Sequence, residues 1–462
     1  MKKRMNLKMA FISAAIISLA ACTNSNEPNQ PEDPVQPSEK ETVVLQGEIN
    51  GIRSLSADTT YLLKGFVYVT DNSKLNIEAG TVIKGDKDTK ATLIVEKGGK
   101  IEAIGTPASP IVFTSNQAVG ERNYGDWGGI IICGNGRTNS ATGVGKIEGG
   151  PRSEYGGNDD YDNSGTLRYV RIEFPGVEYA TDNEINGLTL GAVGSGTTID
   201  HIQVSYCGDD SYEWFGGMVN ASYLVAYRGW DDEFDTDNGY RGKVQFAVGL
   251  RDPNVADKSK SNGFESDNDA SGSSNEPFTQ AVFSNVSLFG PYTTTSDIVD
   301  PQKGNGQFQA AMHLRRNTQL RCYNSIFAGW PIGLFIENGG KGNAQENAIN
   351  GSLILNNNIM AGMKVNFKED EKGTADFNYT YWNESSRNNT LLTNNTDLGL
   401  VDPFNITSPK FYASNSNGVI FGKANFNSDD LSGMTNVNFV GAFGTEDWTE
   451  GWCNFDPQNT IY

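Results

Sequence analysis

The chain has 462 residues and a formal net charge of −20 at pH 7, and 37% of its residues are hydrophobic. A chain of this length can bury a large core or hold several domains. Its 53 glycines, with abundant asparagine and threonine, favour a turn-rich all-β protein. The acidic balance argues against nucleic acid as a partner and fits cations, cationic proteins or neutral sugars, although acidity also serves solubility alone.

The N-terminus has the three parts of an export signal. Residues 2–4 (KKR) are basic, residues 9–20 are apolar, and residues 19–22 (LAAC) are small after the leucine. The apolar run is too short for a membrane-spanning helix. The last four residues resemble the lipobox of bacterial lipoproteins. This resemblance implies that residues 1–21 are removed and that Cys22 is lipidated, palmitate included, so that the protein is anchored to a membrane.

A proline-rich stretch follows the predicted lipidation site. Residues 22–42 are rich in Asn, Pro, Glu and Ser, a composition that cannot bury a core, and we expect a disordered tether. Thr23 and Asn24 replace the aspartate that retains bacterial lipoproteins in the inner membrane. By this resemblance the protein is expected at the outer membrane, and the periplasmic or cell-surface side stays open.

The remaining residues, 43–462, are expected to form one domain of short strands. Residues 75–80 (LNIEAG) and 98–105 (GGKIEAIG) resemble the opening rungs of right-handed parallel β-helices, the pectate-lyase-like architecture. Strands of three to five residues, with glycine or asparagine at the bends, agree with that solenoid. Residues near 134–166 are expected to leave the coils in a long excursion. The aromatic C-terminus is expected to cap the open end of the stack.

A repeat in residues 207–269 predicts the register of the coils. Its first two copies are related by a shift of 22 residues, and the third follows after a further 30. Because strand side chains alternate between faces, the aromatic positions predict an inward stack. The inward stack comprises Tyr212, Phe234 and Phe264; the outward columns comprise Glu213, Asp235 and Glu265 beside Phe215, Asp237 and Asp267.

The outward columns are candidate calcium ligands. Carboxylates on neighbouring rungs, about 4.8 Å apart, repel by roughly 1 kcal/mol in water and several-fold more at a protein surface. Raised pKa values, a basic neighbour such as Arg241 or Lys243, or a bound cation would offset this repulsion. Calcium suits an all-oxygen ligand set. The candidate metal ligands are Glu213, Asp235, Asp237, Glu265 and Asp267.

A catalytic alternative rests on the same stretch. Asp210, Asp235 and Asp237 weakly resemble the carboxylates of polygalacturonases, and Asp235 and Asp237 are expected about 6.7 Å apart on one strand face. The order of the motifs differs from that family, and its Gly-His-Gly element is missing. With only two histidines, His201 and His313, acid–base catalysis by histidine is not expected.

Aromatic residues flank the acidic columns. Phe215, Trp230 and Tyr240 are candidate sugar-stacking residues, whereas Trp214 is expected to face inward. Besides Cys22 the chain has Cys133, Cys207, Cys322 and Cys453, which could form disulfides in three pairings or remain small buried side chains.

Longer phrases resemble a poorly characterised family of bacterial β-helix lipoproteins, found in Bacteroidota and as spirochaete outer-membrane proteins. They are residues 209–217 (DDSYEWFGG), 231–235 (DDEFD), 239–246 (GYRGKVQF) and the terminal Trp448 and Trp452. The resemblance implies the fold and the cellular location of the protein but no activity. The leading hypothesis is a non-catalytic binding or accessory lipoprotein, serving an outer-membrane uptake receptor or a glycan. A polysaccharide lyase or glycoside hydrolase is the alternative.

Overall fold

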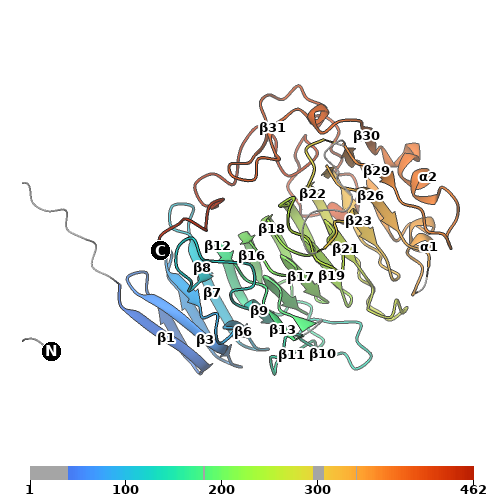
Figure 1. Cartoon of the computed structure of the whole chain (residues 1–462). Helices are drawn as coiled ribbons and strands as arrows, with labels where there is room; N and C mark the ends of the chain where they lie inside the picture. Colours follow the sequence, from blue (N-terminus) through green and yellow to red (C-terminus); the bar gives the residue numbers. More distant parts are fainter. Residues whose placement is uncertain (1–39, 181–182, 295–305, 340) are drawn as a thin grey trace, which may run out of the picture. The chain divides into compact units, whose positions relative to one another are not determined.

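Short parallel strands account for nearly all regular structure in the computed structural model, which describes residues 40–180, 183–294, 306–339 and 341–462. Within these residues, 26 strands join in one continuous sheet (Figure 1). The predicted signal peptide, Cys22 and nearly all of the tether lie outside the described residues. No helix of the described part is long and apolar enough to cross a membrane.

The sheet winds through three parallel ladders, and each coil contributes to all of them. Ladder A runs from the ends of β1 (Thr42–Ile49) and β3 (Thr60–Val69) through β6 (Thr92–Val95), β9 (Gly129–Cys133), β15 (Leu188–Gly191), β17 (Tyr212–Phe215), β19 (Phe234–Asp237), β21 (Phe264–Ser266), β23 (Ala310–Leu314), β26 (Ile332–Ile336) and β29 (Val365–Phe367).

Ladders B and C share their central strands, which bend between the two. Ladder B comprises β2 (Ile52–Leu55), β4 (Lys74–Ile77), β7 (Lys100–Ile104), the first halves of β12 (Gly165–Glu173), β16 (Thr198–Ser205), β18 (Asn220–Tyr227), β20 (Lys243–Leu250) and β22 (Val282–Phe289), then β24 (Arg321–Tyr323) and β27 (Ile354–Asn356). Ladder C comprises the first halves of β1 and β3, then β5 (Val82–Gly85), β8 (Ile111–Ser115), the second halves of the shared strands, β25 (Ile326–Ala328), β28 (Ile359–Ala361) and β30 (Thr390–Leu392). The parallel β-helix predicted from sequence is thereby confirmed.

The core is a stack of side chains from successive coils. Tyr212, Phe234 and Phe264 are fully buried, and their ring centroids follow one another at 5.4 and 6.0 Å. Trp214, also fully buried, stacks on Tyr212. Aromatic pairs of this kind add about 0.5–1.5 kcal/mol each beyond their buried area. The inward column expected from the repeat is therefore present.

The aromatic C-terminal segment lies along the side of the coils and not over their open end, which corrects the expectation of a cap. Trp452 packs edge-on against Tyr169 and His201, and Trp448 packs against Tyr223. These three partners form an aromatic column where ladders B and C meet. Its burial and hydrogen bonds such as those between Gln203 and the backbone of Asn454 hold the segment there. At the last coil, Trp382 of α2 (Phe377–Asn383) contacts Phe367 of β29.

Two insertions leave the coils beside ladder A. Residues 134–164 carry the hairpin β10 (Gly145–Lys146) and β11 (Glu154–Tyr155), close to the excursion expected at 134–166. A second insertion carries β13 (Glu178–Ala180) and β14 (Asn183–Glu184). Other short elements are α1 (Ala344–Ile349) and the hairpin β31 (Leu400–Asp402) and β32 (Lys410–Ala413). The four cysteines of the described part, Cys133, Cys207, Cys322 and Cys453, are free thiols, so none of the three disulfide pairings is formed.

Candidate functional site

The outward face of ladder A carries the two predicted columns. Glu213, Asp235 and Glu265 are register partners on β17, β19 and β21, and His313 of β23 continues the column. In the second column Phe215 pairs with Asp237. The backbone N–H of Asp267 donates to Thr236, which places Asp267 on the following rung.

The downstream part of the columns is neutralised by basic side chains of the next coil. Arg315 binds Glu265 and, at 2.9 Å, Asp267, while Arg316 binds Asp267 at 2.7 Å. Burial opposes ionisation of Glu265, but the hydrogen bond to His313 and the charge of Arg315 outweigh it, so the pKa of Glu265 is lowered. Glu265 and Asp267 thus belong to a closed ion-pair network.

The basic neighbours expected from sequence do not reach the columns. Arg241 binds Asp160 of the long insertion at 3.0 Å, and Lys243 donates to the carbonyl of Ser432. Lys243 starts a strand of ladder B, so its side chain stands on a different face of the coil. The expectation that Arg241 or Lys243 compensates the negative charge of the columns was wrong. Arg315 and Arg316 compensate this charge, but only in the downstream half.

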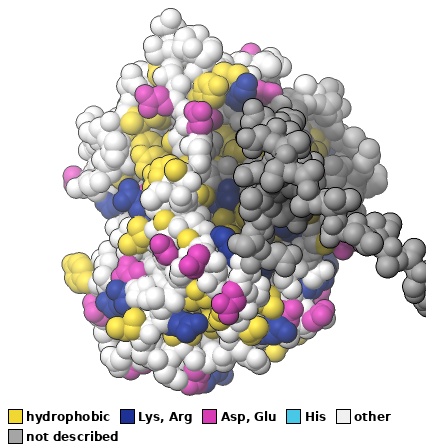
Figure 2. All heavy atoms as spheres, turned by 90° about the vertical axis from the view of Figure 1, so that its left-hand side faces the viewer, with side chains coloured by type: hydrophobic (Ala, Val, Ile, Leu, Met, Phe, Trp, Pro, Cys, Tyr) yellow, Lys and Arg dark blue, Asp and Glu magenta, His cyan; other side chains and the backbone are white. Residues whose placement is uncertain are grey.

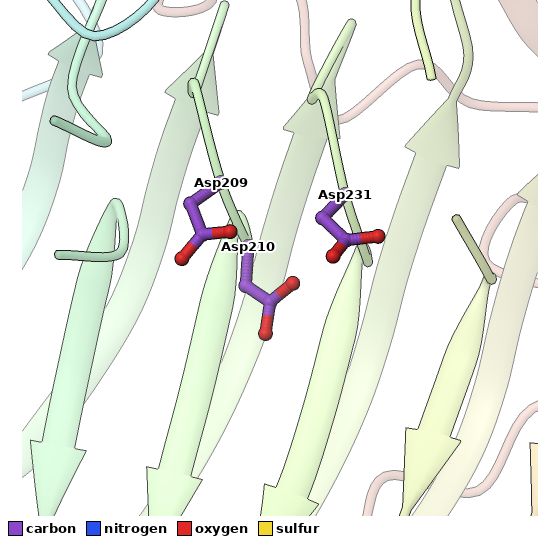
Figure 3. A group of neighbouring side chains, drawn as sticks. All are labelled: Asp209, Asp210 and Asp231. Carbon is purple, nitrogen blue, oxygen red and sulfur yellow. The ribbon is translucent and has the colours of Figure 1, made fainter. Parts of the chain in front are cut away.

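The upstream part of the columns joins a cluster of five carboxylates in two overlapping groups. Oxygens of Asp210, Glu213 and Asp235 lie within 4.8 Å of one another, and so do oxygens of Asp209, Asp210 and Asp231. The second group comes from the loops that enter β17 and β19 on neighbouring coils (Figure 3). Among the described residues, no ion pair joins any of the five to a basic side chain.

A hydrogen-bond ladder holds Asp210 in place. Its Oδ1 accepts from the backbone N–H of Asp232 at 2.8 Å, and Asp232 in turn accepts from the N–H of Asn262. Asn186 on the preceding coil accepts from the N–H of Asp210 at 3.2 Å, and Asn262 accepts from Ala310 at 3.2 Å. Four coils therefore use one position in the same way, twice with asparagine and twice with aspartate.

The cluster is buried enough to disfavour its own charge. Asp210 is only 8% exposed and Glu213 only 5%. Burial first, and the neighbouring carboxylates second, raise the pKa of Asp209, Asp210, Glu213 and Asp235 well above the ordinary range. Burial also raises the pKa of Asp231 to about 7. These groups must take up protons or share a cation.

Two oxygens of the cluster lack a partner. Oδ1 of Asp231 and Oδ1 of Asp235 are enclosed, and neither has a hydrogen-bond donor among the described residues. An enclosed oxygen without a donor costs about 1–3 kcal/mol. All-oxygen groups of this kind match calcium, which takes six to eight oxygen ligands in variable geometry. The residues present therefore fit calcium.

The cluster opens into a cleft of about 930 Å³. Asp209 and Asp231 line it together with the aromatic rings of Tyr124 and Trp230, which meet edge to face at 5.5 Å. Arg315 and Arg316 also line the cleft. Acidic and basic side chains are likewise interspersed on the described surface at the β1 end of the stack (Figure 2). The cleft combines carboxylates, aromatic rings and guanidinium groups, a set suited to glycans.

The three predicted stacking residues have different places. Trp230 lines the cleft, as a ligand-binding role requires. Phe215 stacks on Tyr155 of the long insertion, which covers it. Tyr240 is fully buried against Trp214, and its hydroxyl donates to Val219, so Tyr240 is a core residue and its predicted role was wrong. Asn238 and Gly239, both at positive φ, turn the chain inward before it.

Sequence reasoning singled out Asp210, Glu213 and Asp235 but not Asp209, Asp231 or Tyr124. The 22-residue repeat already aligns Asp209 with Asp231. Both residues precede their strands, where the alternation of faces does not say which way a side chain points.

Comparison with known proteins gives one family. Residues 47–399 match the model of a pectate-lyase-like β-helix domain, which covers most of the described coils. No curated protein matches the chain.

Proposed function

Since the chain belongs to the family of pectate-lyase-like β-helix domains, we propose that it is a glycan-binding protein of the cell envelope that holds calcium in the ladder A cleft. The observation that carries this proposal is the cluster of five carboxylates, none of which forms an ion pair with a basic side chain among the described residues. It adjoins the downstream part of the columns, which Arg315 and Arg316 neutralise. The fold alone supports glycan binding and glycan cleavage equally.

Two positions for a cation follow from the two carboxylate groups. Asp210 belongs to both groups, because its carboxylate faces Asp209 as well as Asp235. The N–H of Asp232 holds one of its oxygens in place. Calcium there would neutralise the cluster and keep coordination positions open toward the cleft. Hydroxyl or carboxylate oxygens of a glycan would complete the coordination. Tyr124 and Trp230 would pack against its sugar rings.

The proposed cellular location is the outer membrane. It is supported by the basic, apolar and small-residue segments before Cys22 and by the tether composition of residues 23–41. A lipid at Cys22 would anchor the domain, and the cleft would present glycans to an uptake receptor.

A second candidate, a polysaccharide lyase or glycoside hydrolase, is favoured by the raised pKa values. A buried carboxylic acid that keeps its proton near neutral pH is what a general acid needs. Asp210, Glu213 and Asp235 lie closer together than the roughly 6.5–9.5 Å of an inverting pair. Asp235 paired with Asp237 remains the alternative catalytic pair.

The experiment measures calcium, glycans and turnover on one set of proteins. Calorimetry with calcium and a glycan array, with calcium or with chelator, are run on the wild type, on Asp235→Asn and on Asp88→Asn, an exposed control. We expect both binding signals to be lost in Asp235→Asn and kept in the control. A wild type that binds no calcium would overturn the proposal. Release of reducing ends or unsaturated sugars, abolished by Asp235→Asn, would establish the enzyme instead.

A further inference from the structure

The corner between ladders B and C carries aromatic rings on backbone that favours asparagine. Tyr169, His201, Tyr223 and Phe246 have φ values of 51°, 55°, 56° and 59°. The next coils place Asn285, Asn324 and Asn357 at the same corner with φ of 54°, 50° and 59°. Asparagine tolerates this left-handed conformation, whereas bulky side chains adopt it at a conformational cost. Four successive coils bear that cost, and we therefore expect the rings to have a function.

The C-terminal segment accounts for only part of this column. Trp452 covers Tyr169 and His201, and Trp448 meets an edge of Tyr223. Tyr223 and Phe246, stacked at 5.0 Å, also line two adjoining hollows of about 510 and 390 Å³. Thr435 of the C-terminal segment lines both hollows. We call these two hollows the corner groove.

The ladder B side of the groove is polar and repeats from coil to coil. Asp200, Ser222 and Gln245 are register partners on β16, β18 and β20, and all three line the groove. Asn220 lies beside them and Lys243 on the next coil. Both ends of the Gln245 amide are held by Thr435, so the Ser222 hydroxyl and the Asp200 carboxylate are the groups of the column that face a ligand. The rungs lie about 4.8 Å apart, close to the length of one sugar unit in an extended chain.

Two of the three charged side chains that line the groove, Asp200 and Lys243, have partners, and the third, Glu446, is exposed to solvent at the second hollow. Asp200 binds Arg168 at 3.0 Å and accepts from Ser222, and the Lys243 ammonium donates to the Ser432 carbonyl at 2.8 Å. The second hollow is walled by the rings of Phe421, Phe439 and Trp448. A groove with few charges, repeated polar groups and aromatic walls suits a neutral ligand with apolar and hydroxyl faces.

We propose that the corner groove binds a neutral oligosaccharide, with sugar units lying along successive coils against Tyr223 and Phe246. This site stands apart from the acidic cleft, which is built on the outward face of ladder A. Its binding needs no cation, because neither of the carboxylate groups that could hold a metal among the described residues lies in the groove. It therefore survives chelation, whereas the cleft proposed above depends on calcium.

Saturation-transfer NMR tests this on the intact protein in excess EDTA, with cellohexaose, mannohexaose and maltohexaose as probes. The key variant is Phe246→Asn, which gives this coil the residue that later coils use at the same corner. We expect its melting temperature to match or exceed that of the wild type and its saturation transfer to fall at least five-fold. A second variant, Ser222→Tyr, fills the groove from the half-buried ladder B face and should abolish the transfer.

Asp231→Asn, in the acidic cleft, serves as the matched control and should leave transfer in EDTA unchanged. No transfer to the wild type from any of the three probes would overturn the proposal. So would transfer that persists in both groove variants, or that disappears in Asp231→Asn, since the sugars would then lie in the cleft. Calcium binding by the cleft is measured separately, so loss of one site does not imply loss of the other.

Discussion

Asp210 accepts a 2.8 Å hydrogen bond from the backbone N–H of Asp232 at a position where the coils before and after this pair use asparagine. An asparagine oxygen would accept this bond as well. The hydrogen bond therefore does not explain why two buried residues are aspartates. The carboxylate of Asp210 faces Asp209 and Asp235 in the cluster, where the proposed cation would bind.

Replacing Asp210 with asparagine separates the hydrogen bond that this side chain accepts from the negative charge that it adds to the cluster. Asp210→Asn keeps the bond from Asp232 and removes one of five crowded carboxylates, so the calcium-free protein should be as stable as the wild type or up to about 1 kcal/mol more stable. The wild type should gain about 2.7 kcal/mol at a calcium concentration 100 times its Kd, and the variant should lose most of that gain. Thermal melting with and without calcium measures both effects.

Asp267→Asn is the matched control, since Asp267 belongs to the same face but binds Arg315 and Arg316. It should be less stable than the wild type and keep its calcium response. If Asp210→Asn instead is strongly destabilised while calcium leaves the wild type unchanged, the cluster is held internally and binds no cation.

The pH dependence of the calcium-free protein has a definite sign. Carboxyls whose folded-state pKa is raised stabilise the fold below their unfolded pKa, near 4, and lose that contribution as pH rises through the folded value. For Asp231 the folded value is about 7. In chelator, stability should therefore fall between pH 5 and pH 8, on the order of 1–3 kcal/mol. The lowered pKa of Glu265 acts in the opposite sense only below about pH 4.

Denaturant melts at each pH, in chelator and in saturating calcium, test this dependence. Calcium should flatten it, because the cation stabilises the ionised cluster at high pH and competes with protons at low pH. A calcium-free protein that becomes more stable from pH 5 to pH 8 would contradict the buried cluster.

The sequence predicted the columns because its 22-residue repeat fixes both the register and the face of each strand. The repeat aligns Tyr212 with Phe234 and Glu213 with Asp235, and β17 and β19 pair in this register. The neutralising Arg315 and Arg316 could not be found in this way. They belong to the coil after Phe264, and the insertion between β22 and β23 interrupts the repeat there.

Positions outside the strands were the hardest to predict. Tyr240 follows a turn through Asn238 and Gly239, both at positive φ, and the turn sends its ring into the core. Asp209 and Asp231 precede their strands, so alternation gave them no face. The side on which the C-terminal Trp448 and Trp452 pack depends on an aromatic column assembled from residues far apart in the chain.

Removing the basic partner of the downstream columns should be costly. Arg315→Gln leaves Glu265 without an ion pair to arginine and leaves Asp267 with Arg316 as its remaining basic partner. Breaking a buried pair in this way costs about 3–5 kcal/mol, and Arg315 is 21% exposed, so the low end is expected. Calcium should recover part of this loss, because a cation can replace the missing charge. Lys74→Gln, which removes the more exposed pair with Glu102, should cost less than about 1 kcal/mol.

The proposed membrane attachment rests on one residue, Cys22, outside the described part of the chain. Cys22→Ser should abolish lipid incorporation and move the protein from the membrane to the soluble fraction, because a thiol is the attachment point of the lipid. Labelling with a palmitate analogue and membrane fractionation of the producing cells measure both effects. Cys453→Ser, a free thiol of the domain, should change neither. A Cys22→Ser protein that stays in the membrane fraction would contradict the lipid anchor.

The C-terminal segment should be held to the coils chiefly by Trp452. This side chain is 1% exposed, packs against Tyr169 and His201, and donates from Nε1 to the carbonyl of Trp448 at 2.7 Å. Trp452→Ala removes these contacts and should cost about 3–5 kcal/mol.

The effect of Trp452→Ala should be local, because the coils below the segment keep their own core of Tyr212 and Trp214. Hydrogen exchange should become faster in residues 444–462 and at the B–C corner, while ladder A stays protected. Tyr161→Ala, at an 82% exposed aromatic residue, should leave exchange unchanged. Equal acceleration of exchange throughout the coils would show that the segment and the β-helix unfold as one unit.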